Sequence, residues 1–247
     1  MTTEIIQRGP AEALAGLLGV PMPEDALPLC WHWVYLLDRP AQTELGRDGH
    51  VAAGVEPGRR RMFAGGRVEA VAPLHFDEPA TRRTELVATT EKQGRSGRLV
   101  FTTIAQRIYQ RDELVVDERQ DIVYRDLPTA RAEPEPTGEP VPAAAGEWEI
   151  EVTPPLLFRF SALTYNGHRI HYDRDYARDV EGYPGLVTHG PLQALAMAEA
   201  ARGAGTVFEY RLVAPLFEHQ GLFARAAGTE TFVRDRSGRE TARGTFA

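Results

Sequence analysis

The sequence contains a single cysteine, Cys30, among its 247 residues. It can therefore form no intrachain disulfide and no cysteine cluster for zinc, which favours a reducing compartment, and we predict a cytoplasmic location. There is no run of about eighteen apolar residues and no long apolar core near the N-terminus. We therefore predict neither a membrane span nor a signal peptide.

The chain also lacks an excess of positive charge. Its formal net charge is -7 and its pI is about 5.6, so long-range electrostatics oppose nonspecific binding to nucleic acid or to an anionic membrane. With 43% hydrophobic residues, the chain is long enough to bury the core of one large domain or of two smaller ones.

Residues 127–146 contain five prolines and the run Ala143-Ala144-Ala145, with almost no large apolar side chain. Proline removes backbone donors and this composition offers nothing to bury, so we predict an extended linker between an N-terminal half, 1–126, and a C-terminal half, 147–247. The alternative is a long surface loop within one domain.

The N-terminal half combines one apolar segment with a run of strands. Residues 28–37 are apolar nearly all round, which predicts a helix buried against a sheet. Residues 84–90, 99–105 and 114–124 have strand composition, and the short spacers between them favour antiparallel hairpins.

The C-terminal half repeats this order of elements. Thr153 and Pro154-Pro155 predict the start of a helix that continues to Leu163, and the Ala-rich residues 191–201 predict a second helix. Strands are expected near residues 209–217, 221–234 and 240–246, with Ser237-Gly238 turning the last pair. The two halves together predict a duplicated α+β fold.

The segment 160–173 crowds polar and ring-bearing side chains into a short loop, and the Gly-rich residues 182–190 then lead into the Ala-rich helix. Its frame, Asn166-Gly167-His168-Arg169-Ile170-His171-Tyr172-Asp173 followed by His189-Gly190, resembles the signature of the MaoC-like hydratases and dehydratases. That signature has an aspartate where this chain has Asn166. With Met62-Phe63-Ala64-Gly65-Gly66 and the Pro-rich segment, the chain is most similar to the branch of type 2 hydroxyacyl-thioester dehydratases and itaconyl-CoA or mesaconyl-C4-CoA hydratases.

This resemblance implies a double hot-dog fold, in which each sheet wraps round a central helix and only the C-terminal half carries a catalytic loop. It implies reversible hydration of a short 2-enoyl-CoA, with acyl-CoA as the binding partner and with neither metal nor redox cofactor. Hydration needs a base for water, an acid for Cα and donors for the enolate oxygen.

Three residues are the candidate catalytic groups. We predict that His171 carries the proton, because its ordinary pKa is close to neutral. Asn166 cannot take up a proton, and we expect it to position water or substrate through hydrogen bonds. Gly190 presents a first-turn amide, which suits an oxyanion donor.

Five further residues are candidate substrate contacts: Arg169, Tyr165, Tyr172, His189 and Trp31. The tyrosines either line the acyl pocket or fill core, and His189 either touches substrate or packs under the loop. Because Trp31 and Trp33 cannot share a helix face, we expect one to line the cavity and the other to lie in the core. Arg169 suits a CoA phosphate or an acyl carboxylate, whereas Arg59-Arg60-Arg61 is either a solvated charge run or a CoA contact. We interpret Asp173 as a helix cap or as a partner of His171.

Two other functions fit the same residues. A hot-dog thioesterase would direct water at the carbonyl carbon of the same thioester, and a noncatalytic acyl-CoA binding subunit is expected if Asn166 disables the site. A homodimer is also possible, although two hot-dog halves in one chain can already form the pairing of single-domain relatives.

Overall fold

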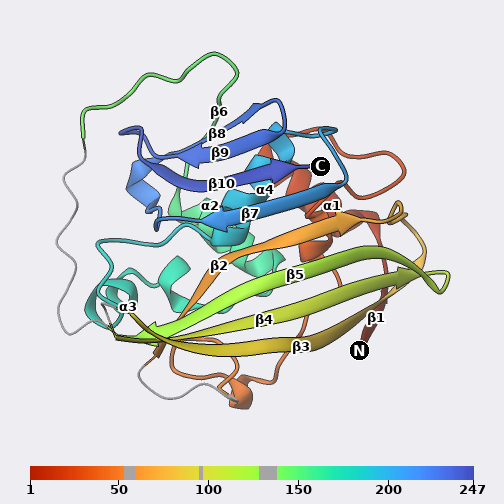
Figure 1. Ribbon diagram of the computed structural model, residues 1–247, viewed down its shortest axis with the longest axis horizontal. Helices are drawn as coiled ribbons and strands as arrows, with labels where there is room; N and C mark the ends of the chain where they lie inside the picture. Colours follow the sequence, from red (N-terminus) through yellow and green to blue (C-terminus); the bar gives the residue numbers. More distant parts are fainter. Residues whose placement is uncertain (53–58, 95–96, 128–137) are drawn as a thin grey trace.

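The computed structural model describes residues 1–52, 59–94, 97–127 and 138–247, and its main feature is a ten-stranded sheet (Figure 1). The strands of the N-terminal half are β1 Thr2–Ile5, β2 Arg59–Ala70, β3 Pro79–Gly94, β4 Gly97–Gln110 and β5 Glu113–Asp126. Those of the C-terminal half are β6 Trp148–Ile150, β7 Val207–Leu212, β8 Leu222–Ala227, β9 Glu230–Arg234 and β10 Glu240–Phe246.

The order β1-β3-β4-β5-β2-β7-β10-β9-β8-β6 joins the two halves through β2 and β7. These strands pair antiparallel from Gly65↔Arg211 to Glu69↔Val207. At the junction a Cβ on Gly65 would lie 2.4 Å from the carbonyl oxygen of Tyr210, so only glycine lets the strands approach this closely. The sheet is therefore continuous across both halves.

The predicted strands of the N-terminal half are confirmed and extend further than expected. β3, β4 and β5 form two long antiparallel hairpins, because short spacers bring each strand straight back beside the one before it. In the C-terminal half the turn at Ser237-Gly238 is confirmed between β9 and β10. The single strand expected at 221–234 is wrong: Gly228, with φ 63°, turns the chain between β8 and β9.

Both helices predicted in the C-terminal half are present. Thr153 caps α2, Pro154–Leu163, by accepting a hydrogen bond from the backbone N–H of Leu156. Helix α4, Gly190–Ala200, is buried from residue 192 to residue 198 and packs against β8, β9 and β10. It is the central helix of its half, and it lies on the same face of the sheet as α2 and α1, Arg8–Leu18 (Figure 1).

The helix predicted at 28–37 is wrong, because only a 3₁₀ turn, η1 Trp31–Val34, forms there. Cys30 and Leu36 adopt left-handed φ values of 70° and 53°, which end helical structure on both sides. Tertiary hydrogen bonds hold the turn: Trp31 Nε1 donates to Glu199 and Trp33 Nε1 donates to Glu118. The α-helix of the N-terminal half is instead α1, which precedes this segment and buries Ala11, Leu14 and Leu18.

The predicted linker is described only in part. Residues 128–137 lie outside the described residues, and residues 138–146 form neither helix nor strand. The division into halves at this segment remains a prediction. None of the helices in the described ranges is long and apolar enough to cross a membrane.

Candidate active site

A cavity of about 1290 Å³ lies between the two halves. Its walls come from β2, β4 and the segment 45–51 of the N-terminal half, and from segment 164–172 and the start of α4 in the C-terminal half. This volume exceeds the usual range for small-ligand pockets. It can hold an acyl group together with part of a long carrier.

His171 lies at the wall of this cavity, at the end of the 3₁₀ turn η3, Arg169–His171. Its Nδ1 donates a hydrogen bond to the carbonyl oxygen of Val187 at 2.7 Å, so Nε2 is the nitrogen left to accept a proton. Burial, aided by the nearby His168, holds the pKa of His171 well below its ordinary value. The ring is therefore neutral and ready to act as a base.

His189 lies behind His171 rather than in the cavity wall. The two rings stack with centroids 3.6 Å apart, and His189 Nε2 is 2.8 Å from Ser161 Oγ. His189 is fully buried and does not line the cavity. Its predicted contact with substrate is replaced by packing, which fixes the plane of the His171 ring.

The other two candidate catalytic residues both line the cavity. Asn166 Oδ1 accepts a hydrogen bond from the backbone N–H of His168 at 3.0 Å, so its carbonyl oxygen is engaged and its amide N–H₂ remains available. Gly190 begins α4, where a Cβ would lie 3.1 Å from Phe63. Its own N–H has no backbone acceptor in the described part of the chain, as expected for a first-turn amide.

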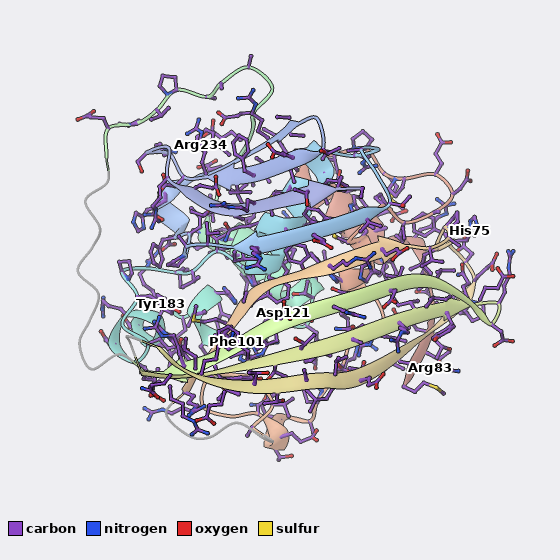
Figure 2. All side chains as sticks on the ribbon, viewed as in Figure 1. His75, Arg83, Phe101, Asp121, Tyr183 and Arg234 are labelled. Atoms are coloured by element: carbon purple, nitrogen blue, oxygen red, sulfur yellow. The ribbon has the colours of Figure 1, made fainter. Side chains whose placement is uncertain are left out.

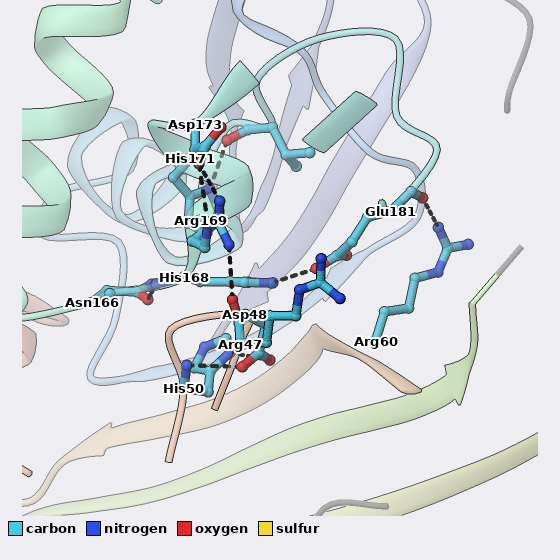
Figure 3. A network of polar contacts seen from close by, with 12 residues as sticks. Arg47, Asp48, His50, Arg60, Asn166, His168, Arg169, His171, Asp173 and Glu181 are labelled. Carbon is cyan, nitrogen blue, oxygen red and sulfur yellow. Dashed lines mark hydrogen bonds and ion pairs between the residues drawn. The ribbon is translucent and has the colours of Figure 1, made fainter. Parts of the chain in front are cut away.

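A segment of the N-terminal half docks directly onto the segment 164–172, a contact that the sequence did not predict (Figure 3). The backbone N–H of Arg169 donates to the carbonyl oxygen of Asp48 at 2.9 Å. A Cβ on Gly49 would lie 1.8 Å from the carbonyl oxygen of Gly167. His50 lines the cavity 3.3 Å from Asp48 and its ring centroid is 4.2 Å from that of His168. Only the Asp48-Gly49-His50 triplet, polar and glycine-centred, could have signalled this contact.

His168 and Glu181 form a second unpredicted pair, with Nε2 and Oε1 2.9 Å apart (Figure 3). Burial raises the pKa of Glu181 to about 7 and holds the pKa of His168 well below its ordinary value. Near neutral pH the pair is therefore a hydrogen bond between a neutral imidazole and a carboxyl that is partly protonated. Asp48, His50 and His168 place donor atoms within 4.8 Å of one another, but Asp48 bonds to His50 and His168 bonds to Glu181, and we assign them no metal.

The raised pKa of Glu181 predicts a pH dependence of stability. Between the ordinary carboxyl pKa and about 7 the folded state binds more protons than the unfolded state, so the free energy of unfolding falls as pH rises. Relative to Glu181→Gln, the wild type should lose on the order of 3 kcal/mol between pH 5 and pH 8. Urea unfolding across this pH range measures the free energy of unfolding, and Glu230→Gln at an exposed position is the control. Parallel curves for wild type and Glu181→Gln would contradict it.

The remaining predicted contacts divide between the cavity and the core. Tyr165 and Tyr172 line the cavity and are 54% and 43% exposed, so neither fills core. Trp31 is fully buried and lies away from the cavity, whereas Trp33 lines it. Trp31 is thus the indole in the core and Trp33 the one at the cavity, so Trp31 is not placed to contact a ligand there.

Arg169 lines the cavity but already has a carboxylate partner. Its guanidinium donates to Asp173 Oδ2 at 2.7 and 3.1 Å. Asp173 Oδ1 accepts from the backbone N–H of Tyr176 and caps α3, Arg174–Asp179. Asp173 is thus the predicted cap and does not contact His171. Arg169 is less available for a substrate anion than its sequence position indicated.

The sequence matches the model of the hydroxyacyl-thioester dehydratase type 2 family over residues 30–218. The chain belongs to this family. It is 45% identical over 208 residues to mesaconyl-C(4)-CoA hydratase of Chloroflexus aurantiacus, covering 81% of this chain and 74% of that one. It is 31% identical over 142 residues to the mitochondrial hydroxyacyl-thioester dehydratase type 2 of Schizosaccharomyces pombe, covering 54% of this chain and 45% of the relative.

Several solved structures share the fold of this chain. The crystal structure of HtdX from Mycobacterium tuberculosis aligns over 99% of this chain and 98% of its own, with a TM-score of 0.71 and 15% identity. A MaoC-like dehydratase from Phytophthora capsici aligns over 100% and 94%, with a TM-score of 0.67 and 16% identity. An M. tuberculosis protein described as a double hot-dog fold covers 99% and 92%, with a TM-score of 0.57 and 18% identity. The double hot-dog fold predicted from the sequence is confirmed.

Proposed function

We propose that this protein reversibly hydrates a short 2-enoyl-CoA to the 3-hydroxyacyl-CoA. The observation that carries the proposal is the neutral His171 at the cavity wall, with Nδ1 fixed on Val187 and Nε2 left to exchange a proton. Membership of the hydroxyacyl-thioester dehydratase type 2 family supports the same hydro-lyase chemistry.

In the hydration direction, His171 Nε2 takes a proton from water while the water oxygen bonds to C3 of the enoyl group. The electron pair of the double bond moves toward the thioester, and the N–H of Gly190 stabilises the charge on the enolate oxygen. The imidazolium then gives its proton to Cα, which completes the addition of one water. Its low pKa makes this second transfer favourable.

The acyl group is proposed to be short and to include carboxylated forms. The C. aurantiacus relative is named for a mesaconyl-C4-CoA substrate, and the double-hot-dog cavity has room for a branched dicarboxylic acyl chain. The test is to mix purified protein with crotonyl-CoA and with mesaconyl-C4-CoA, and to follow enoyl absorbance and free thiol together. Loss of the enoyl band without thiol release is expected, whereas thiol release would identify a thioesterase.

Asn166→Ala is predicted to lower kcat for crotonyl-CoA by about tenfold. The substitution removes one group that positions water, and it leaves the backbone N–H of His168 without its acceptor. Asn166→Asp keeps the acceptor for that N–H, so it should fold and retain part of the activity. Steady-state kinetics of both variants measure the effect. Wild-type turnover by Asn166→Ala would contradict the role.

We also propose a cytoplasmic enzyme that forms a homodimer. The single cysteine, Cys30, is buried and free, as expected for a reducing compartment. Leu86 and Val87 on β3 are 64% and 48% exposed beyond the part of this strand that pairs with β1, and such an edge can be covered by a second copy. Light scattering on the purified protein measures the assembly.

A further inference from the structure

Two arginines lie directly opposite each other on neighbouring strands at one end of the cavity. Arg60 of β2 is the cross-strand partner of Arg125 of β5, so both side chains emerge on the same face of the sheet. Both line the cavity. Tyr183, labelled in Figure 2 near the ends of these strands, lies beneath Arg60, whose guanidinium is 5.1 Å from the ring centroid.

Neither guanidinium has an acidic partner among the described residues. The Nε atoms of Arg60 and Arg125 are buried without a hydrogen-bond acceptor in that part of the chain. Arg60 donates to the backbone carbonyl of Glu181 at 3.5 Å (Figure 3) and also interacts with the Tyr183 side chain, and neither contact supplies a full negative charge. The neighbouring Arg59, by contrast, lies 3.7 Å from Asp126.

Like charges facing each other across a strand pair are unfavourable. Burial and the adjacent Arg60 lower the pKa of Arg125, which shows the cost of holding the second charge there. The Glu181 carboxyl, whose pKa burial raises to about 7, is only partly ionised near neutral pH and offsets this repulsion incompletely. Arg61, which also lines the cavity, adds to the positive potential. A bound anion would remove this repulsion.

We propose that Arg60 and Arg125 form a binding site for an oxyanion of the thioester substrate other than the enolate oxygen of the reaction. The site rests on the proposed hydratase function and deepens it. Two planar guanidinium groups side by side suit the oxygens of a carboxylate or a phosphate. The anion is thus the free carboxylate of a dicarboxylic acyl group or a phosphate of CoA, which share this chemistry.

The experiment compares three substrates with different anionic groups, of which crotonyl-pantetheine also lacks the adenosine of CoA. Mesaconyl-C4-CoA carries a carboxylate and the CoA phosphates, crotonyl-CoA carries the phosphates alone, and crotonyl-pantetheine carries neither. Arg60→Met and Arg125→Met are measured on each, with Arg107→Met as the control, because Arg107 lies outside the cavity and pairs with Glu85. If a methionine variant does not fold, Arg60→Lys and Arg125→Lys replace it; they keep the positive charge but lose the planar guanidinium.

For Arg60→Met and Arg125→Met, KM for the substrate that carries the recognised anion is expected to rise tenfold or more at similar kcat. The reason is that the anion is bound alike in the ground and transition states. A rise for mesaconyl-C4-CoA alone identifies the carboxylate; an equal rise for both CoA esters, with crotonyl-pantetheine unaffected, identifies the phosphate. Unchanged KM values, or equal losses on all three substrates, overturn the site while the wild type still hydrates them. If the wild type hydrates none of the three, the proposed function fails and the site with it.

Discussion

Replacing His171 with glutamine is expected to lower kcat by about a thousandfold on any enoyl thioester that the wild type hydrates. Glutamine still donates a hydrogen bond toward Val187 but cannot take up a proton. A single positioned acid–base group contributes about a hundredfold to ten-thousandfold, and here one imidazole makes both transfers. The loss should fall on kcat and leave KM little changed.

The control for this variant is His219→Gln, since His219 is exposed and lies outside the cavity. Circular dichroism and thermal melting should show that both variants fold. A His171→Gln protein that turns over within a few fold of the wild type would remove the central group of the mechanism. It would direct attention to His50 and Asp48, the next titratable pair at the cavity wall.

Gly49→Ala is expected to cost about a hundredfold in kcat/KM although residue 49 need not touch substrate. The new methyl would lie 1.8 Å from the carbonyl oxygen of Gly167, and the backbone φ of 92° is one that alanine rarely adopts. The segment 45–51 must therefore move off the catalytic loop. A displacement of about 1 Å in positioning groups can cost a hundredfold in rate.

The matched control is Gly16→Ala on α1, where a Cβ meets no atom within 4 Å. This helical glycine is exposed, so alanine should raise the free energy of unfolding by about 0.5–1 kcal/mol and leave activity unchanged. Kinetics and urea unfolding of both variants make the comparison. Wild-type activity in Gly49→Ala would show that docking of this segment does not position the catalytic loop.

The sequence predicted what depends on nearby residues. Hairpins with short spacers define β3, β4 and β5, and the Thr153 hydroxyl with its two prolines defines the start of α2. The sequence also singled out Asn166, His171 and Gly190, which the structure places at one cavity; their catalytic roles stay predictions. Asp173 was recognised as a cap from the helical turn that follows it.

What the sequence did not predict depends on contacts far along the chain. The apolar segment at 28–37 has helical composition, yet bonds from Trp31 to Glu199 and from Trp33 to Glu118 hold it in a 3₁₀ turn. Asp48 and His50 were missed because no periodicity in the first half links them to residue 167. The N-terminal half was predicted to lack the catalytic loop, and the sequence did not indicate that it supplies one wall of the cavity.

The junction between β2 and β7 has a consequence for how such a chain can change in evolution. Splitting the gene between the halves would leave two bare strand edges where the sheet is now continuous and would divide the reaction chamber between two products. Each polypeptide would need the other to cover its exposed strand edge, which otherwise favours aggregation, and to complete the cavity. Selection is therefore expected to act on the two halves together. Substitutions in the N-terminal half are constrained by the shared strand pairing and by the cavity wall that it supplies.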